Sequence, residues 1–207
     1  MKTLYIDTSS DYLYSGIVID DILVSEIKNK YEKDLSKEAL PKIIELFEQA
    51  KITPKELDKI IVVNGPGSFT GIRIGITIAK TIAWALNIDI TPISGLTAMA
   101  ISSSTSTYKM PLIDARRGYV YGAIYDKDNN AILKDTHIEL KILLEKAKAR
   151  DIKAITNNNL TINLEIEKYD PDILKIVKYF ETSKGINPHL VNPIYLKKTE
   201  AEEKAGL

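Results

Sequence analysis

The sequence of this chain contains no cysteine, only two histidines, and only one tryptophan and three phenylalanines among its 207 residues. The lack of cysteine excludes disulfide bonds, thiolate metal sites and a cysteine nucleophile. His137 and His189 are far apart in the sequence and do not form the closely spaced pair that binds zinc on a helix. Neither gives a convincing base for a serine–histidine–aspartate triad. We therefore expect no metal site and no catalytic residue in this chain.

The chain also lacks an excess of charge of either sign. Its 28 lysines and arginines balance 28 aspartates and glutamates, so nothing predicts nonspecific binding to nucleic acid or to an anionic membrane. Asp7 lies where a signal peptide needs an apolar core. The longest apolar segment, 72–88, carries Arg73 and Lys80 and is too short to span a membrane. We expect a soluble protein in the cytoplasm, with no membrane partner.

A glycine-rich loop is the most informative stretch that is present. It covers residues 65–75 and lies between a β-branched block, 60–63, and a long apolar segment. Ser68 or Thr70 can cap the helix that follows. A strand, a tight turn and a helix N-terminus direct several N–H groups to one point, which suits a phosphate or carboxylate. The alternative is a turn that needs glycine only for close packing, and no Lys-Ser/Thr pair closes the loop as in a Walker motif.

A weak internal repeat divides the chain into two similar halves. Residues 6–8 and 12–17 reappear as 113–115 and 119–124, at an offset of 107 (114 minus 7). Each half predicts three strands, an amphipathic helix, a further strand and a second helix. Two such lobes would place Asp7 and Asp114 at equivalent strand ends, across a cleft from each other.

This order of elements predicts the fold class. We expect an α/β protein with a duplicated actin-like, ribonuclease H-like fold of two lobes, each a mixed sheet flanked by helices. The N-terminal lobe is expected at 1–106 and a shorter C-terminal lobe with a charged tail at 107–207. The first amphipathic helix is expected at about 35–51, and a helix near 171–184 is expected to close the second lobe.

The cleft between the lobes is the predicted place for an anion or a nucleotide. The candidate residues are Asp7, Thr8, Ser9, Gly65, Gly67, Ser68, Thr70 and Arg73. The alternatives for Asp7 and Asp114 are a magnesium ion held through water and capping of neighbouring N–H groups. Arg116 and Arg117, in the second hairpin, are candidates for holding a phosphate, for pairing with an acidic residue of a partner, or for simple solvation.

The helix predicted at 70–87 is apolar around most of its circumference. One stripe consists of the small residues Gly71, Gly75, Ala79 and Ala83, and the adjacent stripe of the large residues Ile74, Ile78, Ile82 and Leu86. Such a helix must be buried on more than one side. If no other part of the chain covers these stripes, they form an unusually large apolar patch for a monomer. We therefore predict that the eight residues contact another molecule; the alternative is ordinary core packing.

Four segments together resemble one known family. They are residues 6–9, the loop 65–75, residues 114–121 and the closing stretch 193–197, in that order. The sequence is identified as a member of the bacterial TsaB (YeaZ) family. The resemblance implies a non-catalytic subunit of the machinery that makes threonylcarbamoyladenosine at position 37 of tRNAs. It implies dimerisation with the catalytic homologue TsaD through helices of the N-lobe, recruitment of the ATPase TsaE, and contact with tRNA only through the complex.

The resemblance also implies that a metal site is missing. The related TsaD carries a metal-binding histidine pair, and Gly95 and Met99 stand at the corresponding positions here. No cofactor is required on this interpretation, while nucleotide binding and a homodimer in isolation stay open. Two departures from the family are the absence of a histidine in 33–36 and the Arg116-Arg117 pair in place of a single arginine. The tail 197–207 is expected to be frayed without a partner.

Two other functions compete with the interaction subunit. One is an actin-like ATPase or phosphotransferase that uses Asp7 and the glycine loop 65–71. The other is a metallo-glycopeptidase, a function once assigned to this superfamily, and the missing histidine pair argues against it.

Overall fold

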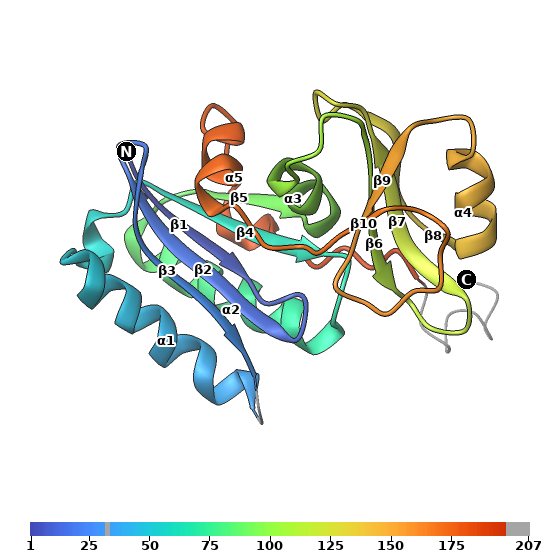
Figure 1. The fold of residues 1–207 in the computed structure, drawn as a ribbon. Helices are drawn as coiled ribbons and strands as arrows, with labels where there is room; N and C mark the ends of the chain where they lie inside the picture. The colour runs from blue at the N-terminus through green and yellow to red at the C-terminus, as the bar shows by residue number, and fades with distance from the viewer. Residues whose placement is uncertain (32–33, 198–207) are drawn as a thin grey trace.

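Two five-stranded sheets, each with helices against it, form the two lobes of the molecule (Figure 1). The structure is a computed structural model that describes residues 1–31 and 34–197. The strand order is β3-β2-β1-β4-β5 in the first sheet and, read in the same sense, β8-β7-β6-β9-β10 in the second. The two orders are the same, so the internal repeat is a structural duplication and the predicted fold class is confirmed.

The first lobe begins with an antiparallel meander and continues with parallel strands. Its strands are β1 (Lys2–Asp7), β2 (Tyr12–Ile19), β3 (Ile22–Lys30), β4 (Lys59–Gly65) and β5 (Ile90–Ser94). Its helices are α1 (Leu35–Ala50), the short η1 (Pro54–Glu56), α2 (Phe69–Leu86) and α3 (Gly95–Ser102). β1 pairs antiparallel with β2 and parallel with β4.

The second lobe repeats this pattern with shorter elements. Its strands are β6 (Tyr108–Asp114), β7 (Tyr119–Tyr125), β8 (Ala131–Glu139), β9 (Ile152–Ile155) and β10 (Ile166–Glu167). Its helix is α4 (Leu140–Ala147), and α5 (Ile173–Tyr179) and η2 (Pro188–Leu190) follow β10. The boundary expected between residues 106 and 107 falls between α3 and β6, where one sheet ends and the next begins.

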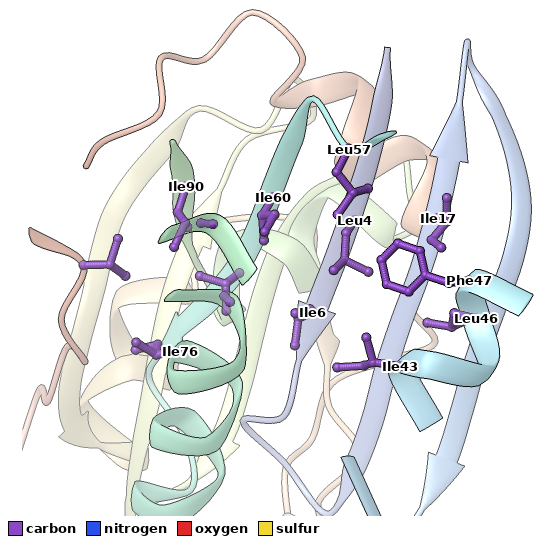
Figure 2. Close-up of a cluster of buried hydrophobic side chains, with 14 of the residues drawn as sticks. Leu4, Ile6, Ile17, Ile43, Leu46, Phe47, Leu57, Ile60, Ile76 and Ile90 are labelled. Carbon is purple, nitrogen blue, oxygen red and sulfur yellow. The ribbon is translucent and has the colours of Figure 1, made fainter. Parts of the chain in front are cut away.

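Successive side chains of β1 point to opposite faces of the sheet, so the first lobe has two hydrophobic cores. Leu4 and Ile6 face α1 and α2, where they meet residues such as Ile43 and Ile76 (Figure 2). Tyr5, between them in the sequence, faces the opposite side of the sheet and packs against α3 and α5. Both faces of this sheet are therefore covered, and every residue of β4 is buried.

The last helix packs against the first lobe, not the second. The prediction that a helix near 171–184 closes the second lobe is wrong, because Ile173 and Val177 of α5 lie in the core beneath β1 and β2. Lys59, at the start of β4, holds the helix there: its Nζ donates to the carbonyl oxygens of Phe180 at 2.5 Å and of Glu181 at 2.9 Å. A lysine suits this position because the last carbonyls of a helix have no partner within the helix.

The following segment also crosses back to the first lobe. Ile186 forms a two-way backbone bridge with Ile90 of β5, and the Ile194 N–H donates to the Asn64 carbonyl at 2.8 Å. Residues 186–195 thus run along α2, on the side of this helix that is opposite to α1. Of the charged tail predicted at 197–207, residues 198–207 lie outside the described residues.

The two hairpins of the repeat differ by one residue in register. Asp7 lies opposite Tyr14, whereas Asp114 lies opposite Val120 and not opposite Tyr121. Because successive side chains of a strand point to opposite faces, this shift turns the second aspartate over. Asp7 shares the α3 face of its sheet, and Asp114 shares the α4 face of its own. Both residues end their strands as predicted, but their side chains are not equivalent.

Candidate functional site

A cleft of about 1100 Å³ lies between the two lobes. Five of the candidate residues line it: Asp7, Ser9, Gly67, Ser68 and Thr70. The second lobe contributes Asp114 and Arg116 among others, and α3 contributes Gly95 and Met99. The strand ends of β1 and β6 therefore meet at one cleft.

Asp7 is a buried carboxylate at this cleft, with a relative exposure of 2%. Its Oδ1 accepts hydrogen bonds from the Ser9 N–H at 2.8 Å and from the Ser9 hydroxyl at 2.7 Å. Burial raises the pKa of Asp7, and the hydrogen bonds from Ser9 oppose this shift by favouring the charged form. Of the two roles considered for Asp7, the structure shows the cap of the β1–β2 hairpin.

Asp114 caps the second hairpin in the same way. Its Oδ1 accepts from the Arg116 N–H at 2.8 Å, two residues further on, but the carboxylate itself is exposed. Arg116 and Arg117 both adopt positive φ angles, of 67° and 56°, as the turn reverses the chain. Arg116 lines the cleft. Its role in anion binding stays a prediction.

The glycine loop packs tightly against the first hairpin. Ser68 caps α2 as predicted, because the Gly71 N–H donates to its hydroxyl at 3.2 Å. The Ser68 N–H donates to the Ser9 carbonyl at 2.7 Å, and a Cβ added at Gly67 would clash with that same carbonyl. Glycine is thus needed here for close approach, which is the packing alternative that the sequence left open.

Three candidate anion ligands do not line the cleft, and the structure corrects their assignment. The Thr8 hydroxyl is buried and donates to the Gly71 carbonyl at 2.7 Å. Gly65 lies against the Ile194 carbonyl, where a Cβ would clash. The Arg73 guanidinium lies 3.9 Å from the centre of the Phe69 ring, on the outer side of α2. Sequence spacing placed these residues near the loop but could not give the direction of their side chains.

Gly95 and Met99, at the positions of the TsaD histidine pair, are tightly packed on α3. A Cβ on Gly95 would lie 3.3 Å from Val63 Cγ1, so a larger side chain does not fit without movement. Met99, one turn later, is an apolar side chain that is 4% exposed. Within residues 1–31 and 34–197, no group of three or more histidine, cysteine, aspartate or glutamate side chains could hold a metal ion.

Two features near the cleft were not predicted. Tyr169 comes from the connection after β10 and reaches the neighbourhood of Asp7 and Tyr5, where burial and the charge of Asp7 raise the pKa of both tyrosines. Asp135 of β8 accepts from the Tyr125 hydroxyl at 3.1 Å and also from the Ser94 hydroxyl, which itself caps α3. This second group ties the two lobes together. Neither pattern has a local sequence signal, because the partners come from distant segments.

The small-residue stripe of α2 faces its own sheet, which corrects part of the predicted interface. Gly71, Gly75, Ala79 and Ala83 are all buried. Added Cβ atoms at Gly71 and Gly75 would clash with Thr8, so the stripe allows α2 to approach β1 closely. These four residues are not available to a partner molecule.

The large-residue stripe of α2 is only partly covered. Ile74, Ile78, Ile82 and Leu86 are all intermediate in exposure. Three of them, Ile78, Ile82 and Leu86, pack on the core that α1 and α2 share. On α1, Leu40 and Ile44 are 47% and 51% exposed and share a flank with Phe47. We call Leu40, Ile44 and these four α2 residues the α1–α2 surface. By length and composition alone α2 passes as a membrane span, yet its packing on β1 and β4 is that of a core helix.

Comparisons with known proteins agree with the fold and the motifs. The family model described as "TsaD: tRNA N6-adenosine threonylcarbamoyltransferase" matches residues 23–175. The chain is 32% identical to a "tRNA threonylcarbamoyladenosine biosynthesis protein TsaB" from Bacillus subtilis, over 100% of this chain and 92% of that protein. It is 30% identical to the protein of the same name from Escherichia coli K12, over 64% of this chain and 58% of the relative.

The solved structure of YeaZ from Pseudomonas aeruginosa superimposes with a TM-score of 0.82 over 94% of this chain and 99% of that one. At 19% sequence identity, this match supports the fold alone. The full-length similarity to TsaB of B. subtilis supports more than the fold. The chain therefore belongs to the TsaB (YeaZ) family, within the wider group of sequences that the TsaD model describes.

Proposed function

We propose that this chain is a non-catalytic subunit that binds a TsaD-like catalytic homologue in the N6-threonylcarbamoylation of adenosine 37 in tRNAs. The observation that carries the proposal is the α1–α2 surface. It combines two exposed apolar residues of α1 with four partly covered apolar residues of α2. An apolar patch of this kind on a folded lobe is typical of a surface that a partner covers.

The chemistry at the cleft supports an accessory role. Asp7 is engaged in capping its own hairpin, and Gly95 and Met99 give α3 no metal-binding side chain. The names of the relatives place them in tRNA threonylcarbamoyladenosine biosynthesis, and the family model carries the name of a transferase. A subunit that lacks reacting groups and presents an apolar surface fits such a system as the partner of the transferase.

The proposal includes the other members of the system. We place a TsaE-like ATPase in the same assembly, the assembly in the cytoplasm, and tRNA in contact with the assembly and not with the isolated chain. A net charge of zero supports the last point, because the isolated chain has no general attraction for phosphates. In the absence of the homologue, we propose that two copies of this chain cover the α1–α2 surface for each other.

Introduction of negative charge on the apolar flank of α1 tests the interface. Leu40→Glu combined with Ile44→Glu is expected to raise the Kd for the catalytic homologue roughly tenfold or more, because both side chains would lie within the apolar contact. The matched control is Ile132→Glu, at a residue of the second lobe that is 49% exposed. Size-exclusion chromatography of the mixed proteins and sedimentation of each chain alone give the readouts. Unchanged association of the double variant would contradict the proposed interface.

A nucleotide site in the cleft is the second candidate. Its support is the cleft volume of about 1100 Å³ and the presence there of Ser68 and Thr70 at the N-terminus of α2, with Arg116 opposite. Calorimetric titration with magnesium and ATP tests binding, and phosphate release tests turnover. ATP turnover that Asp7→Asn abolishes would favour an ATPase over the accessory subunit.

A further inference from the structure

A second groove lies on the flank of α2 that faces away from α1. It has a volume of about 440 Å³ and lies between α2 and the returning segment 191–195. Its polar lining consists of Arg73, Thr77, Lys80, Thr81, Asn192 and the hydroxyl-bearing Tyr195. Two cations and no acidic side chain are found among the described residues that line it. We call it the α2 groove.

Exposed aromatic rings border the α2 groove. Phe69 and Tyr195 stack on each other with ring centres 4.9 Å apart and an angle of 24° between the planes. They are 48% and 41% exposed, although large aromatic side chains usually gain stability from burial. Trp84, the only tryptophan, is 67% exposed and follows Lys80 by one helical turn on the same flank. Of these aromatic side chains Tyr195 lines the groove, and Phe69 stacks on it.

The two cations are held in fixed positions beside these rings. Arg73 Nε donates to the Tyr195 hydroxyl at 2.8 Å, which uses one of the five N–H donors of a guanidinium. Lys80 Nζ donates to the carbonyls of Val191 at 3.0 Å and His189 at 3.4 Å, which uses two of its three donors. Both side chains keep donors for an anion, and little side-chain entropy remains to be lost on binding.

We infer that the α2 groove is a contact site for single-stranded RNA, in which a base stacks on the Phe69–Tyr195 pair and Arg73 and Lys80 hold the adjacent phosphate. Cationic grooves with exposed aromatic side chains are the common design for this ligand. An acidic peptide would use the cations but would leave the exposed parts of the Phe69 and Tyr195 rings, which Arg73 covers only in part, in contact with water. The inference rests on the proposed place of this chain in tRNA modification, and it adds a direct contact within the assembly.

The position of the groove is compatible with the proposed subunit contact. The α1–α2 surface and the α2 groove lie on opposite flanks of the same helix, because α1 borders one flank and residues 191–195 border the other. A partner on the first surface therefore leaves the groove open.

The experiment uses the assembly of this chain with its catalytic homologue and two probes, a tRNA transcript and a single-stranded oligoribonucleotide. Tyr195→Ala is expected to raise the Kd for the oligoribonucleotide roughly 5- to 150-fold, the range for loss of one base–aromatic stack. Arg73→Gln is expected to reduce the slope of log K against log salt by about 0.7, the value for one phosphate of a single strand. The matched control is Arg150→Gln, because Arg150 also lies near an aromatic ring, Tyr108, at 5.8 Å.

The results separate this inference from the proposed function. Ultraviolet cross-linking of the unmodified assembly, read by mass spectrometry, should place RNA on the peptides that contain Phe69 or Tyr195. If the assembly does not form, the proposed function fails, and cross-linking of the single-stranded oligoribonucleotide to the isolated chain, which does not require binding of a whole tRNA, still tests the groove. The inference is overturned if this chain is cross-linked only outside those peptides or not at all, by equal weakening in Arg150→Gln, or by polyglutamate displacing the RNA at equal charge concentration. Circular dichroism of each variant checks that it is folded.

Discussion

A single carboxylate, Asp7, illustrates how a side chain at a candidate binding cleft also has a structural role. It ends β1 at the cleft, where an acidic residue invites comparison with a metal-binding aspartate. Its hydrogen bonds with Ser9 instead fix the turn of the hairpin, and the Ser9 carbonyl in turn receives the Ser68 N–H of the glycine loop. Asp7 thus positions the start of α2 through two successive hydrogen bonds.

Asp7→Asn is expected to keep the fold and to gain stability at neutral pH. Burial raises the pKa of Asp7 in the folded state, so the charged form costs folding free energy above that pKa. This cost falls as the pH drops through the folded pKa towards the unfolded value of about 3.9. The asparagine Oδ1 still accepts from Ser9. Its advantage in melting temperature should therefore be largest at pH 7 and should shrink at lower pH.

The exposed Asp114 provides the control for this prediction. Asp114→Asn alters the corresponding cap of the second hairpin without changing a buried charge. Its melting temperature should stay close to that of the unmodified chain at both pH values. A stability difference for Asp7→Asn that is the same at pH 7 and at the unfolded pKa of about 3.9 would contradict the assigned role of burial.

At the scale of elements, α2 explains why an apolar helix can be read in two ways. Its sequence gives a small and a large stripe side by side, and both are compatible with an intermolecular contact. In the structure the small stripe lets the helix approach β1, and the large stripe remains at the border with α1. The buried area therefore divides between the core of the chain and a surface that we propose a partner covers.

Substitutions on the buried stripe of α2 and on the exposed flank of α1 should differ strongly in their effect on stability. Ala79→Arg is expected to destabilise the chain by roughly 4 kcal/mol or more, because Ala79 is fully buried and an unpaired charge there has no partner. Ile44→Arg, on the exposed flank of α1, should change the free energy of unfolding by only about 0.5 kcal/mol. Urea denaturation followed by circular dichroism measures both. A fully folded Ala79→Arg variant that no longer binds the homologue would restore the small stripe as the interface.

At the scale of the whole molecule, the chain does not divide cleanly into two consecutive halves. The sheets do, but α5 and the segment 186–195 return from the second lobe to the first. This return covers one face of the first sheet, supplies one wall of the α2 groove and ends beside the glycine loop at Gly65. Both proposed binding surfaces are thus features of the first lobe.

Lys59→Met is expected to weaken the packing of α5 and the segment 186–195 on the first lobe. Burial already lowers the pKa of Lys59, and its Nζ donates to three carbonyls at the end of α5, those of Phe180, Glu181 and Ser183. Hydrogen bonds from a charged group of this kind contribute about 1.5–3 kcal/mol, so a loss of roughly 2 kcal/mol is expected. Hydrogen exchange should become faster in 173–186 before it changes in β6. Lys175→Met, on the exposed side of α5, serves as the control.

An equal increase in exchange across both lobes would contradict a local role for Lys59. So would an unchanged free energy of unfolding, because three carbonyls would then have lost a charged donor without cost. Either result would mean that the apolar contacts of α5 alone hold the segment in place.

The sequence by itself determined the duplicated α/β fold, a hydroxyl cap at Ser68 or Thr70, the first helix and the family, because these depend on local periodicity, turn residues and contiguous motifs. Only the tertiary structure decided which stripe of α2 faces inward, where α5 packs, and that Arg73 points to Phe69 and not into the cleft. Periodicity shows that a face is apolar but not which neighbour covers it. The same limit applies to the hairpins, where one residue of register turned Asp114 to the other face of its sheet.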